Sequence, residues 1–396
     1  MTTILYLNII PGDSIHALTL AGIRRYAAAL GWEAAAVPET DTRPEALEDH
    51  FRAHTPVAGC IVECAGLHAG FPPRLFGKTP VVYLHAPPAL YGGAGMRIRW
   101  DGEAIARTAF RELSSIRPPS FAVAGTRSRF DWSIVRSRAF AALAAKTGAK
   151  CLVFETRAET EEERFERLVR WVAGLPRHTA VFATNDFVAR DVVSAARAVH
   201  ISIPHDLKVL GVDNNVAICE KSDPSISSIQ LDFERAGFLA ARLIGDVFAT
   251  KDTKEHKELV NSVPFLARNA TIGPLLAVRR RSTGGSGRRE KFVLEAVEMI
   301  RREACDGLTA MALAKRFPCS RTLFNLRFRE ATGHSVLDEI QHVRLEKALA
   351  LLGGTDTSIG AIADFCGFGS GVELRRVFRA HTGMSLRQWR KENARK

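Results

Sequence analysis

The segment from Ser358 to Gly383 has the sequence SIGAIADFCGFGSGVELRRVFRAHTG. Its apolar spacing predicts two helices, Ile359–Phe365 and Val372–Thr382, separated by a glycine-rich break. Ser358 and Ser370 precede these helices, where a serine side chain caps the first backbone amides. Gly383 follows the second helix, where glycine commonly ends helices. A helix, a short turn and a second helix form the helix-turn-helix pattern.

The same pattern occurs about 50 residues earlier. The segment from Leu308 to Gly333 has the sequence LTAMALAKRFPCSRTLFNLRFREATG, which predicts helices over Ala310–Phe317 and Arg321–Thr332. Further helices are expected over Lys291–Ala304, Val336–Leu352 and Leu386–Asn393. The long helix Val336–Leu352 joins the two units, so their second helices could enter successive major-groove segments, about 34 Å apart.

The second helix of each unit has an apolar face and a polar face. Leu323, Phe324, Phe328, Val372, Leu374, Val377 and Phe378 are expected to pack inward. Arginine pairs with guanine edges, asparagine with adenine edges, and serine with either. The candidate DNA-binding residues are therefore Ser320, Arg321, Thr322, Asn325, Arg329, Ser370, Gly371, Arg375, Arg376 and Arg379. The alternative is a purely structural helical bundle with a solvated arginine face, and the matched pair of units favours DNA.

The charge distribution agrees with a nucleic-acid partner. The chain of 396 residues has a net charge of +12. Residues 287–396 contain 20 Lys and Arg against 13 Asp and Glu, and Arg279–Arg281 adds three more positive charges. A basic domain of this kind suits double-stranded DNA. The apolar runs are too short for a membrane span, and the N-terminus resembles a strand instead of a signal peptide, so we expect a cytoplasmic protein.

Before residue 279, strand and helix patterns alternate. Strands are expected over Ile4–Ile10, Ala58–Val62, Pro80–Leu84, Phe121–Ala124, Cys151–Phe154, Ala180–Ala183 and Lys208–Val212, and helices over Ser14–Leu30, Gly102–Leu113, Ser133–Ala145, Glu161–Val172 and Phe187–Val199. This alternation predicts an α/β fold with parallel sheets in two lobes. The expected domains are an effector domain over 1–278, a flexible Gly/Ser-rich linker over 279–289 and an all-α double helix-turn-helix domain over 290–396.

Two predicted strands of the α/β region end in polar clusters, Asn185-Asp186 and Asp213-Asn214. Open α/β sheets bind ligands at the carboxyl ends of their strands, and carboxylates and amides there can bind vicinal hydroxyls of a sugar. Arg136 could add a charged donor, and Trp132 could stack on the apolar face of a sugar ring. The alternative role for each carboxylate is a helix N-cap, which is favoured for Asp186 but not for Asp213.

Catalytic, metal and cofactor sites have little support. The seven cysteines are scattered, and the spacing of Cys60 and Cys64 inside an apolar run favours buried thiols over a metal or redox pair. Nucleotide-binding, zinc-protease and nucleophile-elbow motifs are absent. We therefore expect no catalytic residues, no metal ligands and no cofactor. A sugar-modifying enzyme fused to a DNA-binding module remains the alternative function.

Residues 290–396 resemble the AraC/XylS-type DNA-binding domain, on the motifs Ile359–Phe368, Val377–Gly383 and Trp389-Arg390. Departures from that family are Leu374, where an aromatic residue is usual, and Leu386, where proline is usual. The resemblance implies a transcription regulator that binds double-stranded DNA, with homodimerisation and contact with RNA polymerase as further expectations.

Residues 1–275 resemble the LacI/GalR-type effector domain, which is related to periplasmic sugar-binding proteins. The matching motifs are Phe182–Asp186, Val209–Asn214 and the segment from Ile226 to Ala241. The resemblance implies a small-molecule effector, a monosaccharide, that contacts Arg136, Asn185 and Asp213. It also places Asn8, Asp13 and Asp101 among the effector contacts, and it implies that ligand closes the two lobes and so alters DNA binding.

Overall fold

The computed structural model describes residues 1–9, 13–38, 44–64, 71–87, 90–93, 95–126, 130–154, 160–248, 269–285, 288–354 and 357–393. The chain forms two compact units. The first unit comprises Met1–Arg99 with Phe233–Ala270, here called the first lobe, and Phe292–Lys396, here called the helical domain. The second unit, here called the second lobe, comprises Trp100–Asp232 with Thr271–Lys291.

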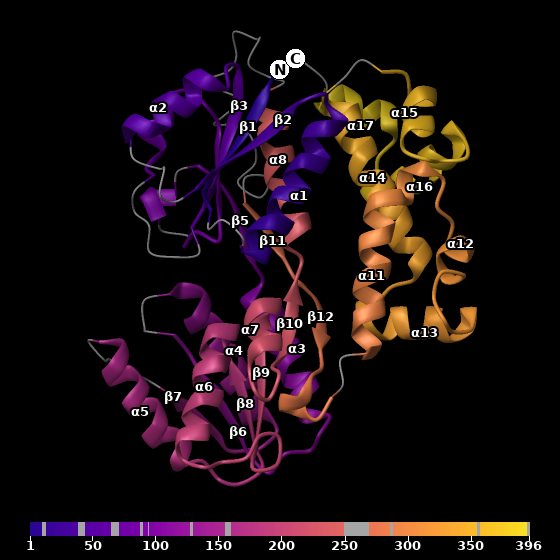
Figure 1. Ribbon diagram of the computed structural model, residues 1–396. Helices are drawn as coiled ribbons and strands as arrows, with labels where there is room; N and C mark the ends of the chain where they lie inside the picture. The colour runs from indigo at the N-terminus through magenta and orange to yellow at the C-terminus, as the bar shows by residue number, and fades with distance from the viewer. Residues whose placement is uncertain are drawn as a thin grey trace. The chain divides into compact units, whose positions relative to one another are not determined.

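The first lobe is built on a six-stranded sheet of order β11-β5-β4-β3-β1-β2 (Figure 1). The strands are β1 (Thr3–Ile9), β2 (Glu33–Pro38), β3 (Val57–Glu63), β4 (Val81–Leu84), β5 (Met96–Trp100) and β11 (Asn269–Ile272). The first five strands pair in parallel. The order 2-1-3-4-5 is that of a doubly wound sheet, in which ligands bind at the switch point outside the carboxyl ends.

Helices cover both faces of this sheet. On one face α1 (Ser14–Ala29) packs against α8 (Phe233–Phe248), and α8 packs on β3 where Gly59 leaves room for Ile244. The α1–α8 contact is close, since a Cβ on Gly22 would lie 1.8 Å from the Glu234 carbonyl oxygen. On the other face, α2 (Pro44–Ala53) and the short helices η2 (Pro73–Phe76) and η3 (Leu90–Gly93) close a second apolar core.

The second lobe repeats this topology with a sheet of order β12-β10-β9-β8-β6-β7. Its strands are β6 (Phe121–Ala124), β7 (Cys151–Phe154), β8 (Thr179–Ala183), β9 (Leu207–Asp213), β10 (Ser227–Leu231) and β12 (Pro274–Val278). The pairs among β6 to β10 are parallel, and β12 runs antiparallel to β10. The predicted α/β class with two parallel sheets is therefore confirmed.

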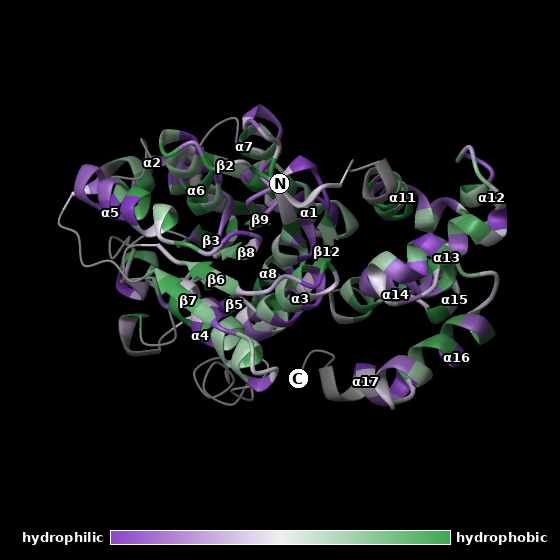
Figure 2. Ribbon diagram, turned by 90° about the horizontal axis from the view of Figure 1, so that it is seen from below, coloured by the Kyte–Doolittle hydropathy of each residue, from purple (hydrophilic) through white to green (hydrophobic). Residues whose placement is uncertain are grey.

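Alternate residues of the second sheet supply two cores. Phe121 and Phe182 face Phe140 on the side of α3 (Gly102–Ser114) and α4 (Asp131–Lys146). The opposite side packs on α5 (Glu161–Ala173) and α6 (Asp186–Ala198), and α7 (Val216–Lys221) contributes Cys219 there. Figure 2 shows hydrophobic colour on β6 and both colours on α5, as expected for a buried strand and an amphipathic surface helix.

All seven predicted strands are present, but the sequence patterns missed β2, β5, β10, β11 and β12. Strand β10 has the sequence SSIQL, and all five residues are buried. Its polar side chains hydrogen-bond to other buried groups, such as the Ser227 hydroxyl to the Arg280 carbonyl oxygen at 3.1 Å. Apolar runs alone therefore cannot locate a strand whose polar groups are satisfied by tertiary contacts.

The first half of the predicted flexible linker is packed, so that part of the prediction is wrong. Arg280 and Ser282 are buried. The Arg280 guanidinium donates to the Ile226 carbonyl oxygen at 3.0 Å, and the Ser282 hydroxyl donates to the Val209 carbonyl oxygen at 2.6 Å. These hydrogen bonds tie η4 (Arg281–Thr283) to the second sheet, although the composition is that of a free linker.

The helical domain contains α11 (Arg288–Glu303), η5 (Ala304–Asp306), α12 (Ala310–Ala314), α13 (Arg321–Thr332), α14 (Val336–Gly354), α15 (Ile359–Phe365), α16 (Gly371–Thr382) and α17 (Leu386–Asn393). The predicted α13, α15 and α17 have the observed bounds. Helix α14 is the central element, and its apolar residues Ile340, Val343, Leu345, Ala348, Leu349 and Leu352 are buried. No helix in the described parts of the chain is long and apolar enough to cross a membrane.

Candidate effector site and nucleic-acid interface

The carboxyl edge of the second sheet gathers the predicted effector residues at its switch point, where β6 and β8 lie side by side. Arg136, on the helix after β6, is buried and donates from Nη1 to the carbonyl oxygen of Thr184 at 2.6 Å. Asp213, at the end of β9, has its Oδ1 3.9 Å from Arg136 Nη1. The segments that follow β6, β8 and β9 thus bring together a guanidinium, a carbonyl oxygen and a carboxylate.

Trp132 lies against the Arg136 guanidinium, whose central carbon is 4.8 Å from the indole ring centroid. Its other aromatic neighbour is Phe130, with ring centroids 5.5 Å apart. The tryptophan therefore fixes the direction of the guanidinium through a cation–π contact. Among the described residues, no group accepts a hydrogen bond from the solvent-shielded Arg136 Nε.

Asp186 is not the helix N-cap that the sequence favoured. Asn185 takes that place, and its side-chain oxygen accepts from the Val188 amide at 2.9 Å. Asp186 is the first helical residue and is 1% exposed. Its carboxyl accepts from the Asn215 amide at 2.7 Å and from the Ser228 hydroxyl at 2.6 Å.

The protonation states follow from this burial. Desolvation, helped by the negative charge of Asp213, raises the pKa of Asp186 to about 8. Burial lowers the pKa of the Arg136 guanidinium, and the charges of Asp213 and Asp186 oppose that shift. Burial thus favours the protonated form of Asp186, next to the Arg136 guanidinium and the Asp213 carboxyl, which lie 3.9 Å apart.

Sequence reasoning missed two polar groups that support this edge, Ser228 and Gln230. Asn214 donates from Nδ2 to Gln230 Oε1 at 2.7 Å, and its backbone amide donates to the Ser228 hydroxyl at 2.9 Å. Asp213 and Asn214 have positive φ values of 102° and 52°. Two adjacent non-glycine residues in this region are uncommon, and such strain is typical of functional sites. The polar sequence of β10 was the signal that could have identified Ser228 and Gln230.

Three further effector contacts were predicted, at Asn8, Asp13 and Asp101. Asp13 and Asp101 are N-caps, of α1 and α3, and accept from the amides of Ile15 at 2.7 Å and Ala104 at 2.8 Å. Each cap occupies one carboxylate oxygen. Asn8 lies near the end of β1, and its side chain is outside the described set.

The carboxyl edge of the first sheet has a polar cluster that the sequence analysis did not identify. The Glu63 carboxylate accepts from the Tyr6 hydroxyl at 3.1 Å and lies 2.7 Å from His85 Nδ1. Burial by itself would raise the pKa of Glu63, but His85 outweighs this effect and the pKa is lowered. Glu63 is the one charged residue in an otherwise apolar strand, and this feature of the sequence could have identified the cluster.

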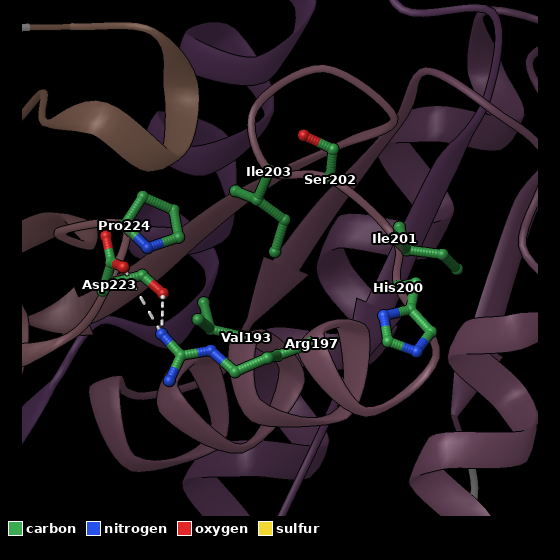
Figure 3. Close-up of a pocket in the computed structure, with 8 residues that line it drawn as sticks. All are labelled: Val193, Arg197, His200, Ile201, Ser202, Ile203, Asp223 and Pro224. Carbon is green, nitrogen blue, oxygen red and sulfur yellow. Dashed lines mark hydrogen bonds and ion pairs between the residues drawn. The ribbon is translucent and has the colours of Figure 1, made fainter.

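A separate groove of about 320 Å³ lies at the other end of the second lobe (Figure 3). It is lined by Arg197, Ile203, Asp223 and neighbouring residues. Arg197 is in the last turn of α6, whereas Asp186 is in the first, and 13 helical residues span about 20 Å. The groove therefore lies away from the carboxyl edge and is not the predicted effector site.

In the helical domain, α12 and α13 form one helix-turn-helix unit, and α15 and α16 form the other. The second helices are built alike. Ser320 and Ser370 are N-caps, and Gly333 and Gly383 end the helices with φ values of 83° and 75°. Arg344 of α14 links the first unit to the domain centre by donating to the carbonyl oxygens of Ala304 and Leu308.

The predicted packing of the second helices is largely confirmed. Phe324, Phe328, Leu374, Val377 and Phe378 are buried. Leu323 and Val372 were expected to pack inward, but they are 37% and 69% exposed, so those two assignments are wrong. Leu323 lies one residue before Phe324 and Val372 lies two residues before Leu374, so neither shares the face that the buried residues form at i, i+3 and i+4 spacing.

The candidate DNA-binding side chains lie outside this core. The exposed members are Ser320, Arg321, Thr322, Asn325, Arg329, Ser370, Arg375, Arg376 and Arg379, with Gly371 half-buried. The hydroxyls of Ser320 and Ser370 also cap their helices, accepting from the amides of Leu323 and Glu373. Within the described residues, no ion pair occupies Arg375, Arg376 or Arg379. Free guanidinium groups on one exposed helix face suit a polyanion.

Comparison with known proteins agrees with this architecture. Residues 100–268 match the model of the periplasmic binding protein-like domain, and residues 313–392 match the model of the helix-turn-helix domain. The chain is a DNA-binding transcription regulator that joins a periplasmic-binding-protein-like effector domain to an AraC-type helix-turn-helix domain. Its ligands are accordingly DNA and a small-molecule effector.

Among individual proteins, the chain is 28% identical to the xylose operon regulatory protein of Escherichia coli (strain K12) over 313 residues, 78% of this chain and 75% of that protein. It is 27% identical to the protein of the same name from Haemophilus influenzae over 298 residues, 74% of each chain. A solved structure of the xylose-binding transcription activator xylR covers 99% of both chains, with a TM-score of 0.55 and 23% identity.

Proposed function

We propose that this regulator responds to a monosaccharide, with D-xylose as the first candidate, bound at the carboxyl edge of the second sheet. The observation that supports this best is the buried Arg136, whose Nε has no acceptor among the described residues although it lies beside Asp213 and Trp132. A buried donor of this kind is costly unless a ligand or water satisfies it. The names of the xylose operon relatives support the choice of sugar.

The charge state of the site favours an uncharged polyol. With Asp186 protonated, Arg136 and Asp213 balance each other, so an ionic ligand would leave one charge unpaired. In this proposal Arg136 donates to a ring or hydroxyl oxygen, Asp213 accepts from hydroxyls, and Trp132 covers an apolar ring face. Asn185, whose side-chain oxygen caps α6, would donate from its amide nitrogen.

Asp186 acts as a positioning residue, because it holds the Asn215 amide and the Ser228 hydroxyl and thereby fixes the segment after β9. Asn8, Asp13 and Asp101 remain predicted further contacts. We expect their substitution to weaken sugar binding less than substitution of Arg136 or Asp213, since Asp13 and Asp101 already serve as helix caps.

For the output, we propose that α13 and α16 read bases in the major groove through the exposed residues named above. Helix α14, which joins the two units, has 19 residues and is therefore about 28 Å long. This length is compatible with two contacts on one DNA face about one turn apart. A homodimer bound to paired half-sites in the cytoplasm, with RNA polymerase as a further partner, completes the proposal.

The alternative of a sugar-modifying enzyme predicts turnover. The relatives' names describe regulation and not catalysis. Incubation of purified protein with the bound sugar, followed by chromatography, distinguishes the two functions, since a modified sugar would contradict our proposal.

A thermal-shift screen of pentoses and hexoses tests the effector site. We expect one sugar to stabilise the protein, by about 2.7 kcal/mol at a concentration 100 times its Kd. Asp213→Ala should abolish the shift, whereas Asp206→Ala should preserve it, because Asp206 lies at the amino end of β9 and pairs with Arg177. A flat screen across all sugars would refute the sugar proposal.

DNA footprinting on sites selected from a random pool tests the output separately. Arg321→Ala and Arg376→Ala should each lose about 1–3 kcal/mol of specific binding. Arg302→Ala is the matched control, because it removes a positive charge from the same domain at an ion pair with Glu303. Unchanged specific binding in both recognition-helix variants would contradict the assignment of α13 and α16.

A further inference from the structure

Charged side chains of the first lobe and of the helical domain meet in a largely buried network. The first lobe contributes Arg25 from α1 and Glu234 and Arg235 from the first turn of α8. The helical domain contributes Arg301 from α11 and Glu346 from α14. No motif in the sequence indicated this network, because its members are separated by up to 321 residues.

Each carboxylate of the network is shared between the two parts. Arg25 donates from Nη2 to Glu346 at 3.1 Å, and its Nε lies 3.2 Å from Glu234. Arg301 donates from Nη1 to the other oxygen of Glu234 at 3.2 Å. Glu346 also lies 3.7 Å from Arg235 Nε. Glu234 therefore binds one arginine from each part, and Glu346 of the helical domain binds two arginines of the first lobe.

Burial distinguishes this network from ordinary surface ion pairs. The side chains of Glu346 and Glu234 are 7% and 11% exposed. Burial acts to raise the pKa of Glu346, but a hydrogen bond from His342 and the charges of Arg25, His342 and Arg235 outweigh it and lower the pKa to about 2. Buried ion pairs contribute little net stability, but breaking one is strongly destabilising, so they can fix one register.

The first lobe supplies a rigid platform for these contacts. A Cβ on Gly22 or Gly237 would lie 1.8 Å or 2.0 Å from a backbone oxygen of the opposite helix, so α1 and α8 touch through their backbones. Arg25 also lies over the ring of Phe238, with 4.3 Å between its central carbon and the ring centroid. A second contact occurs farther along, since a Cβ on Gly353 of α14 would lie 3.7 Å from Asp246 of α8.

We propose that the network centred on Glu346 is a docking site that holds the helical domain on α1 and α8 of the first lobe in one fixed register. The occupant is the helical domain of the same chain, and its charges complement the site. Docking leaves the recognition faces available, because Arg321, Arg329, Arg375, Arg376 and Arg379 stay exposed in the docked arrangement.

The place of α8 in the chain gives the docking site a role in signalling, which rests on the proposed function. The chain passes from the second lobe to the first between Asp232 and Phe233, directly before Glu234. A change of lobe arrangement on effector binding would therefore act on the start of α8, and the docking contacts would transmit it to α14.

Amide hydrogen exchange on the full chain without any sugar tests the docking. Arg25→Ala changes only the first lobe, and Glu346→Gln changes only the helical domain. Docking predicts that each variant speeds exchange across the interface: Arg25→Ala in α11 and α14, and Glu346→Gln in α1 and α8, by about tenfold or more. In the double variant, amide exchange should be only slightly faster than in the single variant with the larger effect, because the two residues share one contact.

Two matched controls accompany these variants. Arg52→Ala removes an exposed α2 pair with Asp49, and Arg302→Ala removes the exposed pair with Glu303. Both should leave exchange in the opposite part at the wild-type rate. If Arg25→Ala and Glu346→Gln each alter exchange only in their own part, the docking proposal is overturned, whatever the sugar screen finds. If either variant is too unstable to measure, Arg25→Lys can replace it. Lysine keeps the positive charge but lacks the planar guanidinium with its several donors, so exchange in the opposite part should again become faster.

Discussion

Replacing Asp186 by asparagine should remove a pH dependence of stability that this one carboxyl imposes on the second lobe. Asp186 is 1% exposed, and burial raises its pKa to about 8 from its ordinary value of 3.8. The folded lobe therefore binds a proton that the unfolded chain releases. The contribution of this carboxyl to the free energy of unfolding is at its maximum below about pH 4, and it is lost as the pH rises towards 8.

The magnitude follows from proton linkage. Between the two pKa values the folded state holds one more proton, so the free energy of unfolding falls by about 1.4 kcal/mol per pH unit. From pH 5.5 to 7.5 the wild type should lose about 2–3 kcal/mol more than Asp186→Asn. The substitution preserves shape, since an asparagine can accept from the Asn215 amide and donate to the Ser228 hydroxyl.

The assay is native-state amide exchange of β8 and β9, which measures the opening free energy of the second lobe without requiring two-state unfolding of the whole chain. Asp206→Asn is the control, because a hydrogen bond from the Ser202 amide lowers the pKa of Asp206 and the residue stays ionised in both states over this range. Its slope should equal that of the wild type. An equal slope in Asp186→Asn would refute the protonated carboxyl and, with it, the neutral character of the site.

Three further outcomes are expected. A hydrogen bond to Glu339 raises the pKa of His334, so the start of α14 should lose stability as the pH rises from 6 to 8, and His334→Gln should flatten that change in amide exchange. Phe328→Ala should cost about 3–5 kcal/mol in thermal unfolding followed by circular dichroism, while Leu326→Ala, 53% exposed, should cost under about 0.5. Gly237→Ala should cost at least about 1–3 kcal/mol in the same assay, because its Cβ would lie 2.0 Å from a backbone oxygen of α1; a loss below 0.5 would contradict the backbone contact.

The helical domain was the most predictable part, because local signals determine its helices. The start of α13 follows from Ser320 and its end from Gly333, and both caps are present. Leu323 and Val372 were assigned wrongly because they were grouped with the inward set by apolar character alone. The buried residues of each helix lie three or four positions apart, as Phe324 and Phe328 do, and Leu323 and Val372 fall outside that spacing.

The α/β region was predictable in class but not in its polar elements. The missed strand β5 has the sequence MRIRW, in which Arg97 is buried and donates to the Leu90 carbonyl oxygen at 2.5 Å. Arg280 in the presumed linker is a similar case. Both arginines are buried because distant carbonyl oxygens satisfy them, and such partners are invisible in a local sequence window.

The sequence placed Arg136, Asn185 and Asp213 at the carboxyl ends of neighbouring strands, where the structure has them. Their contacts with an effector stay a prediction. The error was one residue in register, because Asn185 and not Asp186 caps α6. A cap and a buried first-turn carboxyl look alike in sequence. They differ in what lies beyond the helix, here the Ser228 hydroxyl of β10.

These exceptions share a physical cause that links them to function. Asp186, Ser228 and Glu346 are all buried polar or charged side chains, and each forms tertiary hydrogen bonds or ion pairs with residues far away in the sequence. A core gains stability from apolar residues, so buried polar groups at these places reduce tolerance to rearrangement more than they add stability. Natural sequences depart from consistent patterning mainly where function requires it. Asp186 lies at the proposed effector edge and Glu346 at the proposed docking site, the two places where a ligand signal must be received and transmitted.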